Sequence, residues 1–154
     1  MKSLTLSLCF FVGFVTVALA QAPKFTRQDT LRGSITVERA WWDLIHYDLM
    51  VKVDPEAKTF SGQNTVTYKV LTEAKTMIDL QHPMKITEVM QDGKALKFLQ
   101  NGNAWFITLK KKQVPGAVNS LTISYGGRPQ VSKLPPWEGG VTWAKDSNDN
   151  DFIV

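Results

Sequence analysis

The sequence predicts an all-β protein, arranged as an antiparallel sandwich or a saddle-like multi-strand sheet and preceded by a helical signal peptide. Apolar and polar residues alternate with period two over most of the chain, which is typical of half-buried strands. Turn signals recur about every 8–12 residues. Beyond residue 20, no segment longer than about ten residues carries an apolar stripe at helical spacing. These three observations favour sheets over helices.

Composition and charge narrow the class of protein further. Of the 154 residues, 44% are hydrophobic and 21% are charged, which excludes a disordered chain and a multi-pass membrane protein. The net charge of +4 is mild and spread along the chain, whereas nucleic-acid-binding proteins gather basic residues on one patch. We therefore expect no nucleic-acid partner.

The first element, residues 1–20, has the features of a signal peptide. Lys2 precedes an apolar run that ends in Ala18-Leu19-Ala20, so cleavage is expected before Gln21. A retained membrane anchor is the alternative, because the run is just long enough to span a bilayer. The small residues at its end favour cleavage, after which no stable membrane span is expected. We therefore predict export to the periplasm or the extracellular space, with residues 21–28 as a flexible lead-in.

Residues 45–53 form the clearest expected strand. Apolar and polar positions alternate there, so one face is expected to be half-buried, with Tyr47 and Leu49 directed inward. Residues 54–58 contain a proline and indicate a turn. Alternation resumes over residues 60–70, so the two runs are expected to form an antiparallel pair.

The rest of the chain is expected to form shorter strands joined by tight turns. Asp92-Gly93 and Asn101-Gly102 are hairpin signals, because Asp, Asn and Gly tolerate the positive φ of primed turns. The chain ends on an apolar run at residues 152–154, so the domain, expected over residues 29–154, is predicted to be incomplete at its C-terminal end. Further strands are expected at residues 77–80, 85–90, 95–100, 105–109, 121–125, 141–143 and 151–154, with irregular loops at 110–119 and 130–140.

No group of residues has the spacing of a catalytic or metal centre. His46 and His82 lack a His-Glu-x-x-His context, so a strand-surface position and a loop position are the preferred interpretations. Cys9 is the one cysteine and leaves with the signal peptide, so no disulfide is expected. Residues 146–151 resemble the start of a calcium loop but lack its glycine and its bidentate Glu, which favours a hairpin turn. We assign no catalytic, cofactor-binding or metal-binding residue.

Two tryptophans near the C-terminal end are candidates for contact with another domain. Trp137 lies in a Pro-Pro loop, where a ring is expected to be exposed or at an interface, and Trp143 belongs to the strand that follows. Trp105 sits in an apolar alternation and is expected in the core. Exposed rings also stack on sugars, so a self-contained carbohydrate- or protein-binding module of the bacterial envelope is the alternative function.

Short motifs follow one another along the chain in a specific order. They are DTLRGSIT at 29–36, ERAWWD at 38–43, YDL at 47–49, VDP at 53–55, FSG at 60–62, IDL at 78–80, QDG at 91–93 and PPWEGG at 135–140. No single motif is diagnostic. Their ordered series resembles the N-terminal domain of the aminopeptidase N family of zinc metallopeptidases, in a secreted bacterial form.

The resemblance implies an all-β, saddle-like first domain that packs against a catalytic domain absent from this sequence. In the family, the catalytic domain holds the free amino terminus of a peptide substrate and binds one zinc ion through a His-Glu-x-x-His motif and a downstream Glu. Neither that motif nor the amine-recognition motif occurs here, so no functional residue is carried over. The chain alone is expected to be an inactive scaffold and cleft wall of an exported zinc metalloaminopeptidase.

Overall fold

The computed structural model describes residues 24–73, 76–135 and 137–154. The expected signal peptide over residues 1–20 lies outside these ranges, as do residues 21–23 of the expected lead-in. Within the described ranges, no helix is long and apolar enough to cross a membrane.

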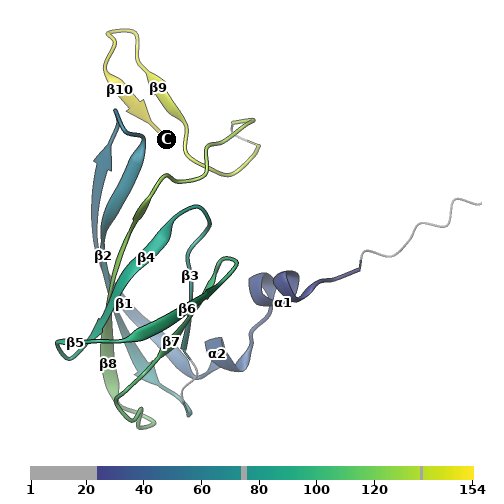
Figure 1. Ribbon diagram of the computed structural model, residues 1–154, viewed down its shortest axis with the longest axis vertical. Helices are drawn as coiled ribbons and strands as arrows, with labels where there is room; N and C mark the ends of the chain where they lie inside the picture. The colour runs from purple at the N-terminus through teal and green to yellow at the C-terminus, as the bar shows by residue number, and fades with distance from the viewer. Residues whose placement is uncertain (1–23, 74–75, 136) are drawn as a thin grey trace, which may run out of the picture.

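Strands dominate the described chain, and the predicted all-β class with antiparallel sheets is confirmed (Figure 1). A five-stranded sheet has the order β1-β2-β8-β4-β5, a three-stranded sheet has the order β3-β7-β6, and β9 and β10 form a separate hairpin. The elements are α1 (Arg27–Gly33), α2 (Val37–Ala40), β1 (Trp42–Asp54), β2 (Thr59–Val70), β3 (Thr76–Asp79), β4 (Lys85–Gln91), β5 (Lys94–Ala95), β6 (Lys97–Asn101), β7 (Ala104–Thr108), β8 (Val118–Gly127), β9 (Trp143–Lys145) and β10 (Asp151–Ile153).

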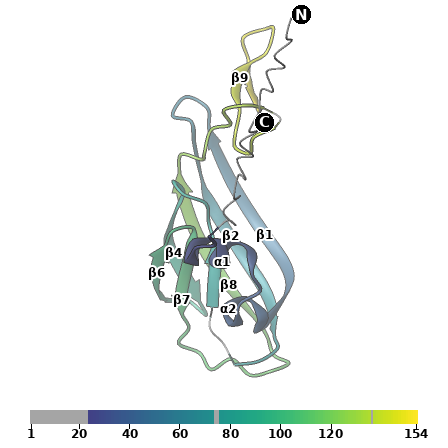
Figure 2. The ribbon, with the colours of Figure 1, turned by 90° about the vertical axis from the view of Figure 1, so that its right-hand side faces the viewer.

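The core lies between the five-stranded and three-stranded sheets (Figure 2). β2 contributes Val66, Tyr68 and Val70, each at most 1% exposed, because alternate positions of a strand point to the same side. Trp105 and Ile107 of β7 belong to the same buried cluster, as expected for Trp105. The two sheets are therefore held together by alternate side chains of inner strands, which β2 and β7 exemplify.

The hydroxyl of Tyr68 joins a polar network at one end of this core. It accepts a hydrogen bond from Nε2 of Gln91 and donates one to Oε1 of Gln113, both at 3.0 Å. The same Gln113 oxygen accepts a bond from Nδ2 of Asn119 at 3.0 Å. Burial raises the pKa of Tyr68 above its ordinary value, so the hydroxyl remains protonated at neutral pH and both of its bonds persist.

Replacing Tyr68 with phenylalanine is expected to lower the free energy of unfolding by about 1–2 kcal/mol, because the buried amides of Gln91 and Gln113 lose their shared partner. Urea unfolding followed by circular dichroism measures the change. Tyr125→Phe is the matched control, since its exposed hydroxyl donates only to the Met50 carbonyl oxygen and water replaces that bond. Equal losses in the two variants would contradict this account of the network.

The N-terminal segment folds into two short helices, α1 and α2, which the sequence analysis does not predict. Thr26 caps α1 because its hydroxyl accepts a bond from the Asp29 N–H, while the Asp29 carboxylate accepts one from the Thr26 N–H at 2.7 Å. Helices of seven and four residues are too short to display an apolar stripe. Because α1 begins at Arg27, the last two residues of the expected lead-in are helical.

Both faces of β1 are exposed, so the prediction that residues 45–53 are half-buried is wrong. Tyr47 lies opposite the buried Val66 and Leu49 lies opposite Asn64, so both side chains do point to the side that carries the core. They are nevertheless 52% and 58% exposed, because β1 is the edge strand and the core cluster forms over its neighbours. Alternation predicts the face on which a side chain lies but not whether another layer covers it.

Candidate functional site

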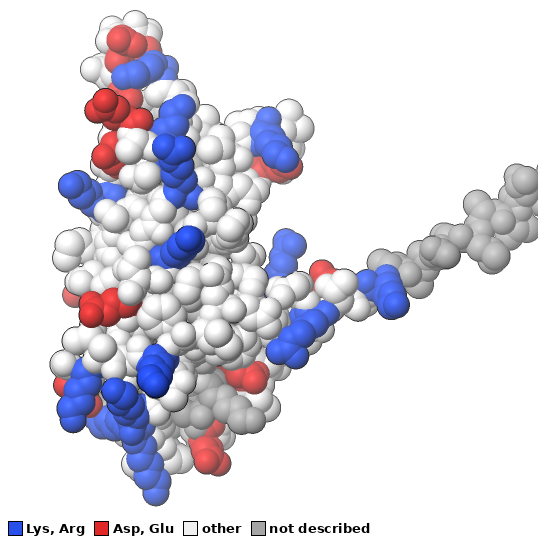
Figure 3. Space-filling view, in the orientation of Figure 1, with Lys and Arg blue, Asp and Glu red and all other residues white. Residues whose placement is uncertain are grey.

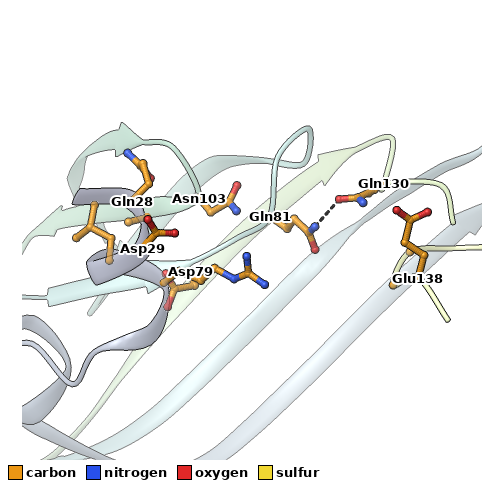
Figure 4. Close-up of a pocket in the computed structure, with 12 residues that line it drawn as sticks. Gln28, Asp29, Asp79, Gln81, Asn103, Gln130 and Glu138 are labelled. Carbon is orange, nitrogen blue, oxygen red and sulfur yellow. Dashed lines mark hydrogen bonds between the residues drawn. The ribbon is translucent and has the colours of Figure 1, made fainter. Parts of the chain in front are cut away.

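A polar pocket opens between α1 and the loop over residues 130–140 (Figure 4). Its volume is about 900 Å³. α1, the end of β3, the β6–β7 turn and the loop each supply part of the lining, so segments far apart in the sequence meet here. The described residues that line it are Gln28, Asp29, Leu31, Arg32, Asp79, Gln81, Asn103, Ala104, Gln130, Glu138, Gly139 and Gly140.

Two carboxylates of the pocket are already bonded within the fold. Asp79 forms an ion pair with Arg39 of α2, with 2.6 Å between oxygen and nitrogen. Asp29 accepts bonds from the N–H and the hydroxyl of Thr26, both at 2.7 Å, and these bonds hold the pKa of Asp29 below its ordinary value. Both carboxylates therefore serve the fold, which favours a structural role over general-base catalysis.

Amide side chains connect the remaining walls of the pocket. Gln81 donates a hydrogen bond to the side-chain oxygen of Gln130, so the end of β3 is joined to the C-terminal loop (Figure 4). Gln28 donates to Oδ1 of Asn101 at 2.9 Å, so α1 is joined to the end of β6. No Ser, Thr, Cys or His occurs among the described lining residues. The described lining offers hydrogen bonds to a polar group but no hydroxyl, thiol or imidazole nucleophile.

Arg39 holds the two helices to the three-stranded sheet. Besides its pair with Asp79, its guanidinium donates to the carbonyl oxygens of Ser34, at 2.9 Å, and Leu31. Arg39→Ala is expected to raise the hydrogen-exchange rates of the α1 amides by about ten- to a hundredfold, because charged hydrogen bonds are lost and the segment opens locally.

Hydrogen exchange read by mass spectrometry checks this prediction. Arg39→Lys is the control for charge, and it is expected to leave exchange fast because a single ammonium does not reproduce the planar fork that reaches several acceptors. If the α1 amides of Arg39→Ala exchanged as slowly as those of the wild type, contacts other than those of Arg39 would hold the segment.

The two tryptophans predicted to contact another domain have different surroundings. Trp137 is 83% exposed in the loop over residues 130–140, so its ring is available to another molecule. Trp143 packs against Phe60 of β2, with 5.5 Å between ring centroids. It also lines a second pocket of about 480 Å³ between the β1–β2 turn and the β9–β10 hairpin. Trp143 therefore helps hold two hairpins together, whereas Trp137 presents a free ring.

The sequence analysis did not identify one exposed apolar surface. This surface lies on β1. Four side chains, which we call the β1 apolar face, share the core side of the sheet and are 42–58% exposed. Leu49 also lines a small apolar opening of about 200 Å³ beside Ile78 of the other sheet. In sequence this face cannot be distinguished from a buried one. The β1 apolar face consists of Tyr47, Leu49, Val51 and Val53.

Solved structures share this fold. A two-domain M1 zinc metallopeptidase bound to L-arginine is 23% identical over 71% of this chain, with a TM-score of 0.54. The M1 zinc metallopeptidase of Deinococcus radiodurans is 22% identical over 70% of the chain, with a TM-score of 0.55. Leukotriene A4 hydrolase of Saccharomyces cerevisiae is 19% identical over 73% of the chain, with a TM-score of 0.57. The fold that the family resemblance predicts is therefore confirmed.

The matched region is a small part of each of these proteins. The chain spans 27% of the two M1 metallopeptidase chains and 18% of the yeast hydrolase. Neither protein-family models nor curated proteins give a match. At these identities the likeness establishes the fold alone.

Proposed function

We propose that this chain is a non-catalytic β domain of an exported zinc metalloaminopeptidase, in which it acts as scaffold and cleft wall. The observation that carries the proposal is the fold shared with part of a two-domain M1 zinc metallopeptidase. The catalytic domain of the same polypeptide would hold the zinc ion and remove amino-terminal residues from peptides. Export rests on the apolar segment over residues 1–20 and its small-residue end.

The described residues do not fit a zinc site of their own. Within the described ranges, no group of three or more His, Cys, Asp or Glu side chains is placed to hold a metal ion. His46 lies on the polar side of β1, and His82 lies in the turn between β3 and β4. We therefore derive no catalytic step through these residues.

The β1 apolar face supports a role as a wall against a second domain. Surface patches of contiguous apolar side chains are typical of interfaces between proteins or domains. Burial of apolar surface stabilises a contact by about 25 cal/mol per Å². Four half-exposed apolar side chains therefore contribute a few kcal/mol to the binding free energy when a second domain covers them. The exposed Trp137 ring is a second candidate for the same contact.

The charge distribution does not favour a nucleic-acid partner. Figure 3 shows Lys and Arg side chains in several separate groups on the viewed face, with uncharged surface between them. Nucleic-acid-binding domains instead gather basic side chains along one groove or helix. A protein partner is better matched to this surface.

The proposal predicts that the purified chain is inactive by itself. It is expected to bind no stoichiometric zinc in an equilibrium titration and to release no amino-terminal residue from aminoacyl substrates when zinc is supplied. Asp79→Asn, which keeps the size of the side chain, is expected to change neither result. Zinc-dependent release by the purified wild-type chain, lost on chelation, would contradict the proposal.

A self-contained binding module is the second candidate, and the 83% exposure of Trp137 favours it. Under this hypothesis the chain binds an oligosaccharide or an envelope protein, and Trp137→Ala weakens binding because one stacking ring is lost. Trp143→Phe is the matched control, since it keeps the aromatic contact with Phe60. Unchanged binding in Trp137→Ala would remove the support for this function.

A further inference from the structure

Asn101 begins the tight turn between β6 and β7. It is followed by Gly102, which has φ of 64°, and it pairs with Ala104, where β7 begins. No other asparagine in the sequence precedes a glycine. The backbone nitrogen that follows an asparagine can attack the amide carbon of the asparagine side chain, and a glycine has no Cβ to block the approach. Asn101 therefore carries the chemistry for loss of its side-chain amide.

The folded turn holds the two reacting atoms apart. Ring closure requires the Asn101 Cβ and the Gly102 nitrogen to point the same way about the bond between Cα and the carbonyl carbon. Asn101 is the last residue of β6, and an extended backbone is rotated about that bond away from this arrangement. The carbonyl oxygen of Gly102 also accepts a hydrogen bond from Nε2 of Gln100 at 3.0 Å. The reaction therefore requires the turn to open.

Helix α1 lies against this turn and restrains it. Nε2 of Gln28 donates a hydrogen bond to Oδ1 of Asn101 at 2.9 Å, so the helix holds the amide that would react. A Cβ added at Gly102 would collide with the same Gln28 side chain, so the two segments are closely packed. Leu31 of α1 is buried in a cluster that includes Ala104. The turn can therefore open at Asn101 only when α1 moves away from it.

We propose that Asn101 is a deamidation site that α1 protects. When α1 separates from the turn, the Gly102 nitrogen attacks Cγ of Asn101, so that an N–Cγ bond forms and the Cγ–Nδ2 bond breaks. Nδ2 leaves as ammonia and takes the proton of the Gly102 nitrogen. Water then opens the cyclic imide at either of its carbonyl groups, which gives aspartate or isoaspartate. Both reacting groups lie in one turn, so the proposal needs no partner surface and does not rest on the proposed peptidase function.

Isoaspartate at this position keeps α1 from returning to the turn. Its main chain runs through Cβ and Cγ, so the backbone between β6 and β7 becomes longer. The pairing of Asn101 with Ala104 and the hydrogen bond from Gln28 then lose their geometry. Gln28 and Asn103 line the polar pocket, so this wall of the pocket loosens as well. The modification thus makes a reversible opening of α1 permanent.

The rate of deamidation in the purified chain tests the proposal. The chain is incubated in mildly alkaline buffer, and peptide mapping by mass spectrometry follows the exchange of the Asn101 amide for a carboxyl group. An unfolded peptide of residues 97–106 gives the unprotected rate, and the folded chain is expected to react at least about tenfold more slowly. Asn103 is the internal control, because the Cβ of the following Ala104 hinders the attack.

Three variants, each checked for folding by circular dichroism, separate protection by α1 from a general loss of stability. Gln28→Ala removes the bond to Oδ1 and is expected to raise the rate about twofold to tenfold. Arg39→Ala is expected to raise it as well, because Arg39 joins the helices to Asp79 but bonds to neither reacting residue. Lys97→Ala, at the far end of β6, is expected to leave the rate unchanged.

Three results would each overturn the proposal. The first is a folded chain that reacts as fast as the peptide. The second is a wild-type rate in both Gln28→Ala and Arg39→Ala. The third is an increase in Lys97→Ala equal to that in Gln28→Ala, because protection would then not depend on α1.

Discussion

Replacing Trp41 with alanine is expected to lower the free energy of unfolding by about 3–5 kcal/mol. Trp41 is 0% exposed, and its ring stacks on Trp42 at 5.7 Å and meets the edge of Tyr68 at 5.2 Å between centroids. Alanine removes the ring and leaves a cavity that the rigid strands around it only partly fill. Since domains of this size are stable by about 5–15 kcal/mol, the variant loses much of its stability.

Trp137→Ala is the matched control for this prediction. The same change at a ring that is 83% exposed is expected to alter the free energy of unfolding by at most about 0.5 kcal/mol. Guanidinium unfolding followed by far-ultraviolet circular dichroism measures both variants without relying on tryptophan fluorescence. A loss below about 1 kcal/mol in Trp41→Ala would mean that this ring does not anchor the core.

Gly62→Ala is the second substitution with a large expected effect. An added Cβ would lie 2.0 Å from the carbonyl oxygen of Met50 and 3.2 Å from the Tyr125 hydroxyl. The first of these atoms is backbone, so β1 and β2 must separate locally. We expect a loss of about 3 kcal/mol in unfolding free energy, at the upper end for an overpacked site, together with faster hydrogen exchange in β1.

Gly33→Ala provides the comparison for Gly62→Ala. Gly33 is the last residue of α1. Nothing lies within 4 Å of a Cβ added at this position. This variant is expected to be neutral or more stable by up to about 1 kcal/mol, because alanine restricts the unfolded chain and favours a helix. Similar stability of the two variants would show that the close approach at Gly62 is absent in solution.

The turns that carry a local sequence signal agree with their predictions. Asp92 and Gly93 have φ of 50° and 72°, and they join β4 to β5 as the hairpin signal predicts. Gly102 has φ of 64° in the turn between β6 and β7. Asp146 accepts backbone bonds from Asn148 and Asn150, both at 2.8 Å, which agrees with the turn preferred there. Each of these features depends on residues within a few positions of one another.

Features set by distant contacts were not predictable in the same way. The polar pocket joins Asp29, Asp79 and Glu138, which no local pattern relates. The exposure of the β1 apolar face depends on the place of β1 at the sheet edge, and alternation carries no information on strand order. The α1 helix had one readable signal, the Thr26–Asp29 capping box, which is too short to change a prediction based on periodicity.

The size of the native product tests the central claim most directly, which is that this β domain is one wall of a larger peptidase. An antibody raised against the described domain, used on an immunoblot of the cells that make the protein and of their envelope fraction, detects every polypeptide that carries it. The proposal predicts a product far longer than 154 residues that binds zinc. A mature product that ends near Val154 and still releases amino-terminal residues from peptides would contradict it.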